Sequence, residues 1–185
     1  MKSYLGRMKA KDDCPPRKPM PAILWSWLGS LAGIYAIGIC TPLVASRMGI
    51  DGAFLLGSFG ASAVLVYGAP LAEFSQPRNL VGGSLISALI GVAVATNIPS
   101  PESTAFAAAV AVSSSVLFMH LTRSMHPPGG ATALIAVVGG ESIRRLGYWY
   151  VLFPVACGCL ILLAFALVVN NMSRNPHRHY PVYWF

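Results

Sequence analysis

Charged side chains are scarce in this sequence. Lysine and arginine supply 13 of the 185 residues and aspartate and glutamate only 6, so 10% of the chain is charged, where a soluble domain carries about 25%. Hydrophobic residue types make up 55% of the chain. A water-soluble globule needs a charged surface that this chain cannot supply, so the sequence predicts an all-α, multi-pass membrane protein.

Other absences narrow the function. The chain has no G-x-x-x-x-G-K-[ST] loop for ATP-driven transport and no G-x-S-x-G elbow for a serine hydrolase. None of its carboxylates falls in the middle of an apolar stretch, which disfavours a cation site or a carboxylate proton relay. The carboxylates are Asp12, Asp13, Asp51, Glu73, Glu102 and Glu141. We therefore expect no enzymatic activity, no metal and no cofactor.

Basic residues concentrate at the N-terminal end. Residues 1–20 hold Lys2, Arg7, Lys9, Lys11, Arg17 and Lys18. Under the positive-inside rule this segment is predicted to be a cytoplasmic tail, and membrane lipids are expected to surround the protein as a whole. A nucleic-acid-binding arm is not expected, because an apolar membrane stretch follows this segment at once. At the other end, residues 172–185 are predicted to be a tail at the membrane surface, with Tyr180 and Trp184 as interfacial anchors.

Six apolar stretches follow the basic tail. Their approximate bounds are Pro21–Thr41, Gly52–Ala69, Leu80–Ile98, Thr104–Leu121, Gly129–Gly140 and Tyr148–Asn171. Four are long enough to cross about 30 Å of hydrocarbon, whereas the second and the fifth are short or broken by glycine. The distribution of basic residues does not decide whether the fifth stretch spans the membrane or is re-entrant.

A short internal repeat relates the two short stretches. Gly60–Leu65 recurs 70 residues later as Gly130–Ile135, with three identical and three conservative positions. Each copy is the middle element of a three-helix unit, one over residues 21–98 and one over 104–171. Because three is odd, the second unit enters the membrane in the opposite sense. The sequence thus predicts two inverted repeats, in which short or interrupted helices mark the binding site.

The two breaks carry the candidate substrate site. Pro127 and Pro128 stop the preceding helix, and the glycines after them are expected to leave backbone N–H groups uncovered at a helix start, where an anion is a natural partner. The first repeat contains a similar break, formed by glycine and serine. The candidate binding residues are Ser58, Gly60, Ala61, Ser62, His126, Gly129, Gly130, Ala131 and Thr132. The alternative is a proline kink capped by water or by a neighbouring helix, with His126 as a structural donor.

The expected charge of this site limits the substrate. Each helix N-terminus is equivalent to about half a positive charge, so two that face each other supply about one. That suits a small monovalent anion. Candidate pathway residues near the site are Gln76, Arg78, Asn79, His120 and Arg123. Arg78 and Arg123 alternatively mark only the membrane boundary.

Small residues recur every four positions in the long stretches, as in Gly83, Ser87 and Gly91 or in Gly29 and Gly33. Such seams let helix backbones approach closely. They serve packing either within one bundle or between protomers. Because the chain is also small for a complete transporter, we expect a homo-oligomer, a dimer or a trimer.

Four blocks of the sequence carry a resemblance to a known family, namely Met125–Leu134, Ser58–Ala63, Gln76–Asn79 and Tyr180–Trp184. The first is similar to the signature of the HPP family of integral membrane proteins, and the others are similar to recurrent blocks of that family. The resemblance covers about residues 20–185 and implies a four-span protein. Plant plastid and cyanobacterial members are associated with nitrite transport. The resemblance therefore implies transport of nitrite, with nitrate second, and a bacterial cell inner membrane as the simplest location. The alternative is a structural or regulatory membrane subunit that transports nothing. Direction and proton coupling stay open.

Overall fold

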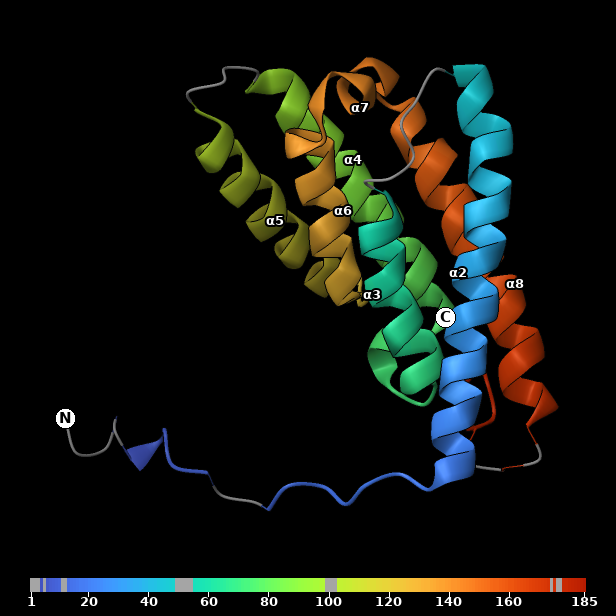
Figure 1. The fold of residues 1–185 in the computed structure, drawn as a ribbon. Coiled ribbons are helices and arrows are strands. Elements are labelled where there is room, and N and C mark those ends of the chain that lie inside the picture. The colour runs from blue at the N-terminus through green and yellow to red at the C-terminus, as the bar shows by residue number, and fades with distance from the viewer. Residues whose placement is uncertain are drawn as a thin grey trace.

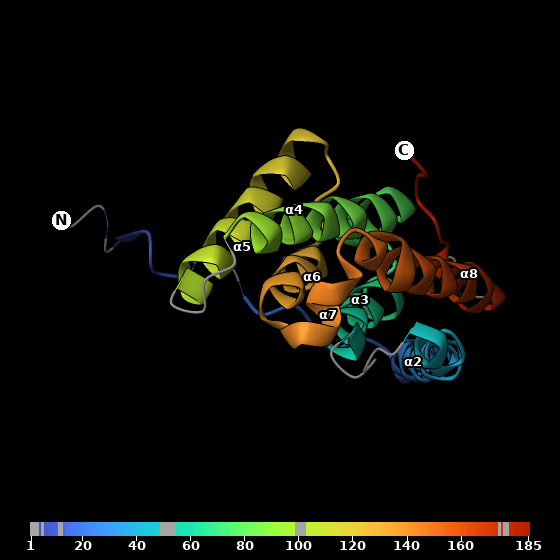
Figure 2. The ribbon, with the colours of Figure 1, turned by 90° about the horizontal axis from the view of Figure 1, so that it is seen from above.

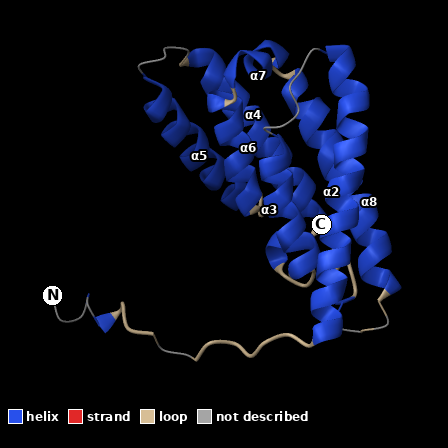
Figure 3. Ribbon diagram, in the orientation of Figure 1, coloured by secondary structure: helices blue, strands red, loops and turns tan. Residues whose placement is uncertain are grey.

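The computed structural model describes residues 4, 6–10, 13–48, 55–98, 103–173, 175 and 178–185. Outside them lie Lys2, Lys11, Asp12, Asp51, Gly52 and Glu102, which the sequence interpretation used. Throughout the described part the regular structure is helical, as Figure 3 shows in blue. The all-α prediction is therefore confirmed.

Ten helical elements make up this part of the chain. They are α2 (Met20–Met48), α3 (Leu55–Gly68), η2 (Glu73–Ser75), η3 (Arg78–Gly83), α4 (Ser84–Asn97), α5 (Thr104–Leu121), α6 (Pro127–Val138), α7 (Gly140–Leu146), η5 (Val151–Ala156) and α8 (Cys157–Met172). The η2 element is a 3₁₀ turn, whereas η3 and η5 are π-helical turns that continue directly into α4 and α8.

Four of the helical segments are long and apolar enough to cross a membrane. They are Met20–Cys40, Arg78–Asn97, Thr104–Leu121 and Val151–Met172. Two shorter apolar helices, Gly57–Gly68 and Pro127–Val138, fall in the second and fifth stretches. The prediction of four long elements and two short ones is confirmed. The amphipathic helix α7 was not predicted, because the fifth stretch was taken to end at Gly140.

The helices alternate in direction along the chain. In Figure 1, α2 runs upward, α3 downward and α4 upward, whereas α5 runs downward, α6 upward and α8 downward. The short helices α3 and α6 contact each other at the centre, with α2 and α8 on one side and α4 and α5 on the other (Figure 2). Helix α2 packs against α3 and α8, and α5 packs correspondingly against α6 and α4.

The two halves share local features at corresponding positions. Residues 62–67 and residues 132–137 show the same order of burial, namely two buried, one exposed, one half-buried and two buried positions. A π-helical turn precedes the last long helix of each half. These features lie about 70 residues apart, which is the offset of the short sequence repeat.

The small-residue seams pack within one chain. A Cβ atom placed on Gly91 would lie 2.7 Å from the carbonyl oxygen of Ala133, so α4 and α6 meet backbone to backbone. Gly29 and Gly33 of α2 likewise leave room for a neighbour, which here is the side-chain ring of Tyr67. The seams therefore hold this bundle together and give no separate support to the homo-oligomer, which stays a prediction.

The C-terminal segment folds back onto the loop after α3. Tyr180 is fully buried, its hydroxyl donates to the carbonyl oxygen of Ser75 at 2.8 Å, and its N–H donates to Oδ1 of Asn171 at 3.1 Å. The N–H of Val182 donates to Oε1 of Gln76 at 2.8 Å. The expectation that Tyr180 is an interfacial anchor is wrong, because its polar atoms find partners inside the protein.

We expect Tyr180→Phe to lower the stability of the purified protein by about 1 kcal/mol, because the buried Ser75 carbonyl loses a donor. Tyr148→Phe is the matched control, since Tyr148 is 58% exposed. Thermal unfolding in mild detergent compares the two variants. Equal melting temperatures for both would show that the Tyr180 hydroxyl contributes nothing to the fold.

Candidate functional site

Four polar side chains meet where α3 crosses α6. The Oγ atom of Ser58 lies 2.7 Å from Oγ1 of Thr132, and the Oγ atom of Ser62 lies 2.9 Å from Nε2 of His126. Ser58 and Ser62 are four residues apart, so they share one face of α3. All four side chains are buried. We call Ser58, Ser62, His126 and Thr132 the polar cluster; the sequence predicted all four as site residues.

The position of His126 fixes the proton arrangement of the cluster. The residue precedes α6 in an extended conformation, and its Nδ1 lies 2.8 Å from the carbonyl oxygen of Phe74. Because a carbonyl only accepts, Nδ1 carries a hydrogen, and Nε2 of the neutral ring accepts from the Ser62 hydroxyl. A proton added to Nε2 reverses that bond, and the Ser62 hydroxyl then donates to the Ser58 carbonyl oxygen, 3.1 Å away.

Backbone groups and one buried tyrosine support the cluster. The Thr132 hydroxyl lies 3.2 Å from the Pro128 carbonyl oxygen, and the Tyr150 hydroxyl donates to the Thr132 carbonyl oxygen at 2.9 Å. The sequence did not single out Tyr150 or Phe74. The identity of these residues gives no clue to their role. Tyr150 donates to a backbone carbonyl oxygen, and Phe74 contributes its backbone carbonyl and not its side chain.

The glycine after the two prolines does not offer a free donor. Pro127 and Pro128 have no N–H, and the N–H of Gly129 donates to the His126 carbonyl oxygen at 2.8 Å. A Cβ atom on Gly129 would lie 2.6 Å from Oγ of Ser87, so this glycine permits the close approach of α4 and α6. The prediction of an uncovered N–H at Gly129 is wrong, because its donor is satisfied locally.

The other small residues of the predicted site lie apart from the polar cluster. Helix α3 begins at Leu55, so Gly60 and Ala61 lie in its second turn, where backbone N–H groups already bond within the helix. A Cβ on Gly60 would meet no atom within 4 Å, and one on Gly130 would meet only the Val112 side chain, at 3.8 Å. Ala61 is exposed, and Ala131 is half-buried. The backbone groups of Gly60 and Ala61, predicted as part of the anion site, therefore lie inside the helix and not at its start.

A cleft of about 590 Å³ lies beside His126. It is lined by Glu73, Phe74, Met119, His120, Arg123, Met125 and Pro127. It brings together the predicted pathway residues His120 and Arg123, both exposed. Its wall reaches the cluster, because the Phe74 carbonyl accepts from His126 and the Met119 sulfur lies 3.4 Å from the His126 backbone nitrogen. We call this space the His120–Arg123 cleft.

The remaining pathway residues hold backbone in place. Nη2 of Arg78 donates to the Thr122 carbonyl oxygen at 2.6 Å, and Nδ2 of Asn79 donates to the Met125 carbonyl oxygen at 2.8 Å. These bonds fix the loop that carries His126. Nε2 of Gln76 donates to the carbonyl oxygens of Pro70 and Ala72, each at 2.9 Å. In this conformation the three side chains position the loops around the cluster.

Comparison with known proteins gives a family and two relatives. Residues 15–181 match the model of the family described as "HPP, transmembrane region". Two transmembrane proteins of Dictyostelium discoideum are similar to the chain: one is 43% identical over 98% of this chain and 57% of its own length, and the other is 41% identical over 100% and 62%. The chain thus spans about three-fifths of the length of these curated relatives. No solved structure matches.

Proposed function

The chain belongs to the HPP transmembrane family, and from that premise we propose that it carries a small monovalent inorganic anion, nitrite first and nitrate second, across a membrane. The observation that carries the proposal is the polar cluster. It is buried where the two short helices cross, and it consists of three hydroxyls and one imidazole. A hydroxyl can donate to an anion without the desolvation penalty of a buried lysine or arginine.

The anion enters the cluster by replacing bonds that the side chains make with one another. A neutral hydrogen bond contributes only about 0.5–1.5 kcal/mol net. Breaking the bonds between these side chains therefore costs little when an anion accepts hydrogen bonds from the same hydroxyls. The imidazole adds a stronger, charge-assisted donor when Nε2 is protonated. The His120–Arg123 cleft supplies an approach to His126, and its lining includes the guanidinium of Arg123 and the carboxylate of Glu73.

We propose further that the two halves, residues 21–98 and 104–171, are inverted repeats. Three observations support this arrangement: the opposite directions of corresponding helices (Figure 1), the matching burial of α3 and α6, and the π-helical turn before each last helix. In such proteins one repeat moves against the other around a site at their interface. Here that movement separates α3 from α6 and opens the polar cluster.

The orientation, location and assembly complete the proposal. The N-terminal flank, where Arg7, Lys9, Arg17 and Lys18 are exposed, lies on the cytoplasmic side. The proposed location in the bacterial cell inner membrane rests on the family resemblance alone, since the two relatives are from Dictyostelium. We propose a dimer or trimer that needs no cofactor.

Uptake of nitrite and nitrate into proteoliposomes tests the function. Liposomes with the purified chain should accumulate nitrite faster than empty liposomes, and a pH gradient shows whether a proton moves with it. Anions should also raise the melting temperature of the purified protein. Folded protein that takes up neither anion and shows no anion-dependent stabilisation would favour the alternative, a structural or regulatory subunit.

We expect Arg123→Gln to raise the KM for nitrite about two- to threefold without changing kcat, because an exposed charge at a mouth attracts the anion but does not bind it at the cluster. The effect should fade at high ionic strength. Arg7→Gln, the same change of charge in the N-terminal tail, is the control. An equal KM in both variants would remove Arg123 from the anion pathway.

A further inference from the structure

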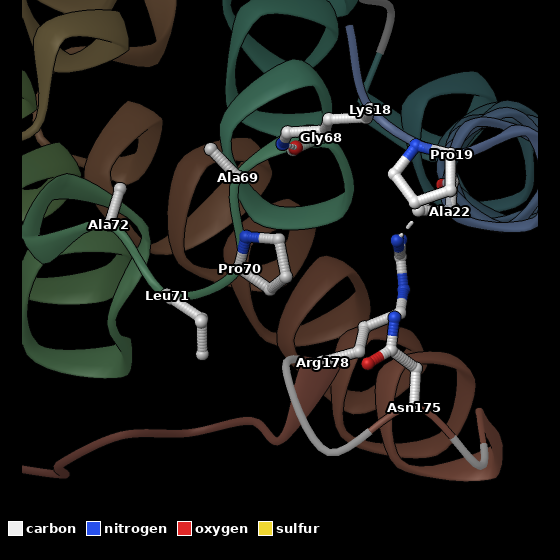
Figure 4. A pocket seen from close by; sticks show the side chains of 10 residues that line it. All are labelled: Lys18, Pro19, Ala22, Gly68, Ala69, Pro70, Leu71, Ala72, Asn175 and Arg178. Atoms are coloured by element: carbon white, nitrogen blue, oxygen red, sulfur yellow. Dashed lines mark hydrogen bonds between the residues drawn. The ribbon is translucent and has the colours of Figure 1, made fainter. Parts of the chain in front are cut away.

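A second cavity lies at the end of the bundle where α2 begins and α3 ends (Figure 4). Its volume is about 380 Å³, within the range of small-molecule sites. Lys18 and Arg178 contribute the charged groups, and residues such as Pro19, Pro70 and Leu71 form an apolar wall. We call it the Lys18–Arg178 pocket. It is separate from the polar cluster and takes no part in the function proposed above.

Arg178 is a buried cation whose hydrogen-bond partners among the described residues are all neutral. Its side chain is 4% exposed, and its Nη1 donates to the Ala22 carbonyl oxygen and to Oγ of Ser26, each at 3.2 Å. Its Nη2 donates to the carbonyl oxygen of Tyr67, and its Nε has no partner. Among the described residues the recorded ion pair is Arg145 with Glu141, on α7. Within the described part of the chain, no carboxylate therefore offsets the charge of this guanidinium.

Lys18 adds a second positive charge to the same pocket. Its Nζ donates to the Gly68 carbonyl oxygen at 2.6 Å, at the C-terminal end of α3. That helix end is equivalent to about half a negative charge, which cannot neutralise two cations. A buried charge without a counter-ion is destabilising by several kcal/mol. The pocket is thus electropositive, and an anionic ligand would offset the charge of the buried Arg178.

The place of the pocket indicates where the anion comes from. Lys18 lies two residues before the span Met20–Cys40, which puts it at the membrane–water interface. Basic segments beside a span attract anionic lipids. We propose that the Lys18–Arg178 pocket binds the phosphodiester headgroup of an anionic phospholipid. The phosphate oxygens accept from the cationic donors, and the apolar wall packs against the glycerol and the upper acyl chains.

Titration of the purified full chain with lipids, followed by native mass spectrometry and thermal unfolding, tests this site. Phosphatidylglycerol should form a one-to-one complex and raise the melting temperature, whereas phosphatidylcholine with the same acyl chains should do neither. Inorganic phosphate distinguishes the sources of the anion. If phosphate raises the melting temperature as strongly as phosphatidylglycerol, and fails to do so in Lys18→Gln, then the pocket binds an anion at Lys18. In that case its ligand is free phosphate and not a lipid.

Lys18 is exposed, so its substitution should leave the fold intact. We expect Lys18→Gln to weaken phosphatidylglycerol binding about fivefold, the loss expected for one lysine near an anionic surface, and Lys18→Arg to retain it. Lys9→Gln removes the same charge from the tail and should change binding little. Equal binding of the two lipids, or equal losses in Lys18→Gln and Lys9→Gln, would overturn the proposal.

Discussion

Replacing His126 by alanine is expected to reduce nitrite uptake about tenfold or more. The substitution removes the donor to the Phe74 carbonyl oxygen and the partner of the Ser62 hydroxyl, and each lost bond to a substrate or a neighbour is worth about 1 kcal/mol. Uptake should also lose part of its pH dependence, because His126 is the titratable member of the polar cluster. Initial rates in proteoliposomes at several pH values measure both effects.

Two further variants make this result specific. His120→Ala removes an exposed imidazole from the neighbouring cleft and should leave most of the uptake intact. His126→Gln keeps a donor and an acceptor in the same place and should recover part of the rate, but without the pH dependence. Because the buried Phe74 carbonyl loses its donor in His126→Ala, size-exclusion chromatography must first show folded protein. Unchanged uptake by folded His126→Ala would exclude the cluster as the substrate site.

The membership of the polar cluster could be predicted because it follows from local sequence. The repeat aligns Ser62 with Thr132, and the proline turn marks His126 as the residue before a helix. Hydropathy likewise gave the four spans, because a segment must be long and apolar to cross a bilayer. In both cases the information lies within a few consecutive residues.

The partners of the cluster and the state of its backbone could not be predicted in this way. The free donor expected at Gly129 was wrong, because prolines remove donors from a helix start and the His126 carbonyl takes the next one. Tyr180 and Arg178 looked like residues of a surface tail. They are buried because backbone carbonyls of distant segments accept their hydrogen bonds. Such carbonyls occur at every residue and leave no sequence pattern.

Gly91→Leu is expected to prevent folding, and Gly91→Ala to destabilise the protein by about 1–3 kcal/mol, the range for overpacking in a tight interior. The Cβ atom would lie 2.7 Å from the carbonyl oxygen and 2.8 Å from the Cα atom of Ala133. Both are backbone atoms of α6, so no side-chain rotation relieves the overlap. Helix α4 must instead move away from α6.

Gly38→Ala is the matched control, because Gly38 also lies within a long helix but a Cβ there meets no atom within 4 Å. It should be neutral or stabilising, since alanine favours a helix over glycine by about 1 kcal/mol. Gly130→Ala, nearest to Val112 at 3.8 Å, controls for a glycine on α6 itself. Thermal unfolding in detergent ranks the three alanine variants by their melting temperatures. If Gly91→Ala is as stable as Gly38→Ala, then α4 and α6 do not pack backbone to backbone.

The same variant connects packing with the site. Helix α6 carries Thr132 and begins directly after His126, while α4 continues from the turn whose Asn79 holds the Met125 carbonyl. A displacement of α4 from α6 at Gly91 therefore disturbs the supports of the polar cluster at both ends. Folded Gly91→Ala should transport more slowly than Gly38→Ala when measured well below its melting temperature. A destabilised variant with normal uptake would show instead that the cluster keeps its geometry independently of this seam.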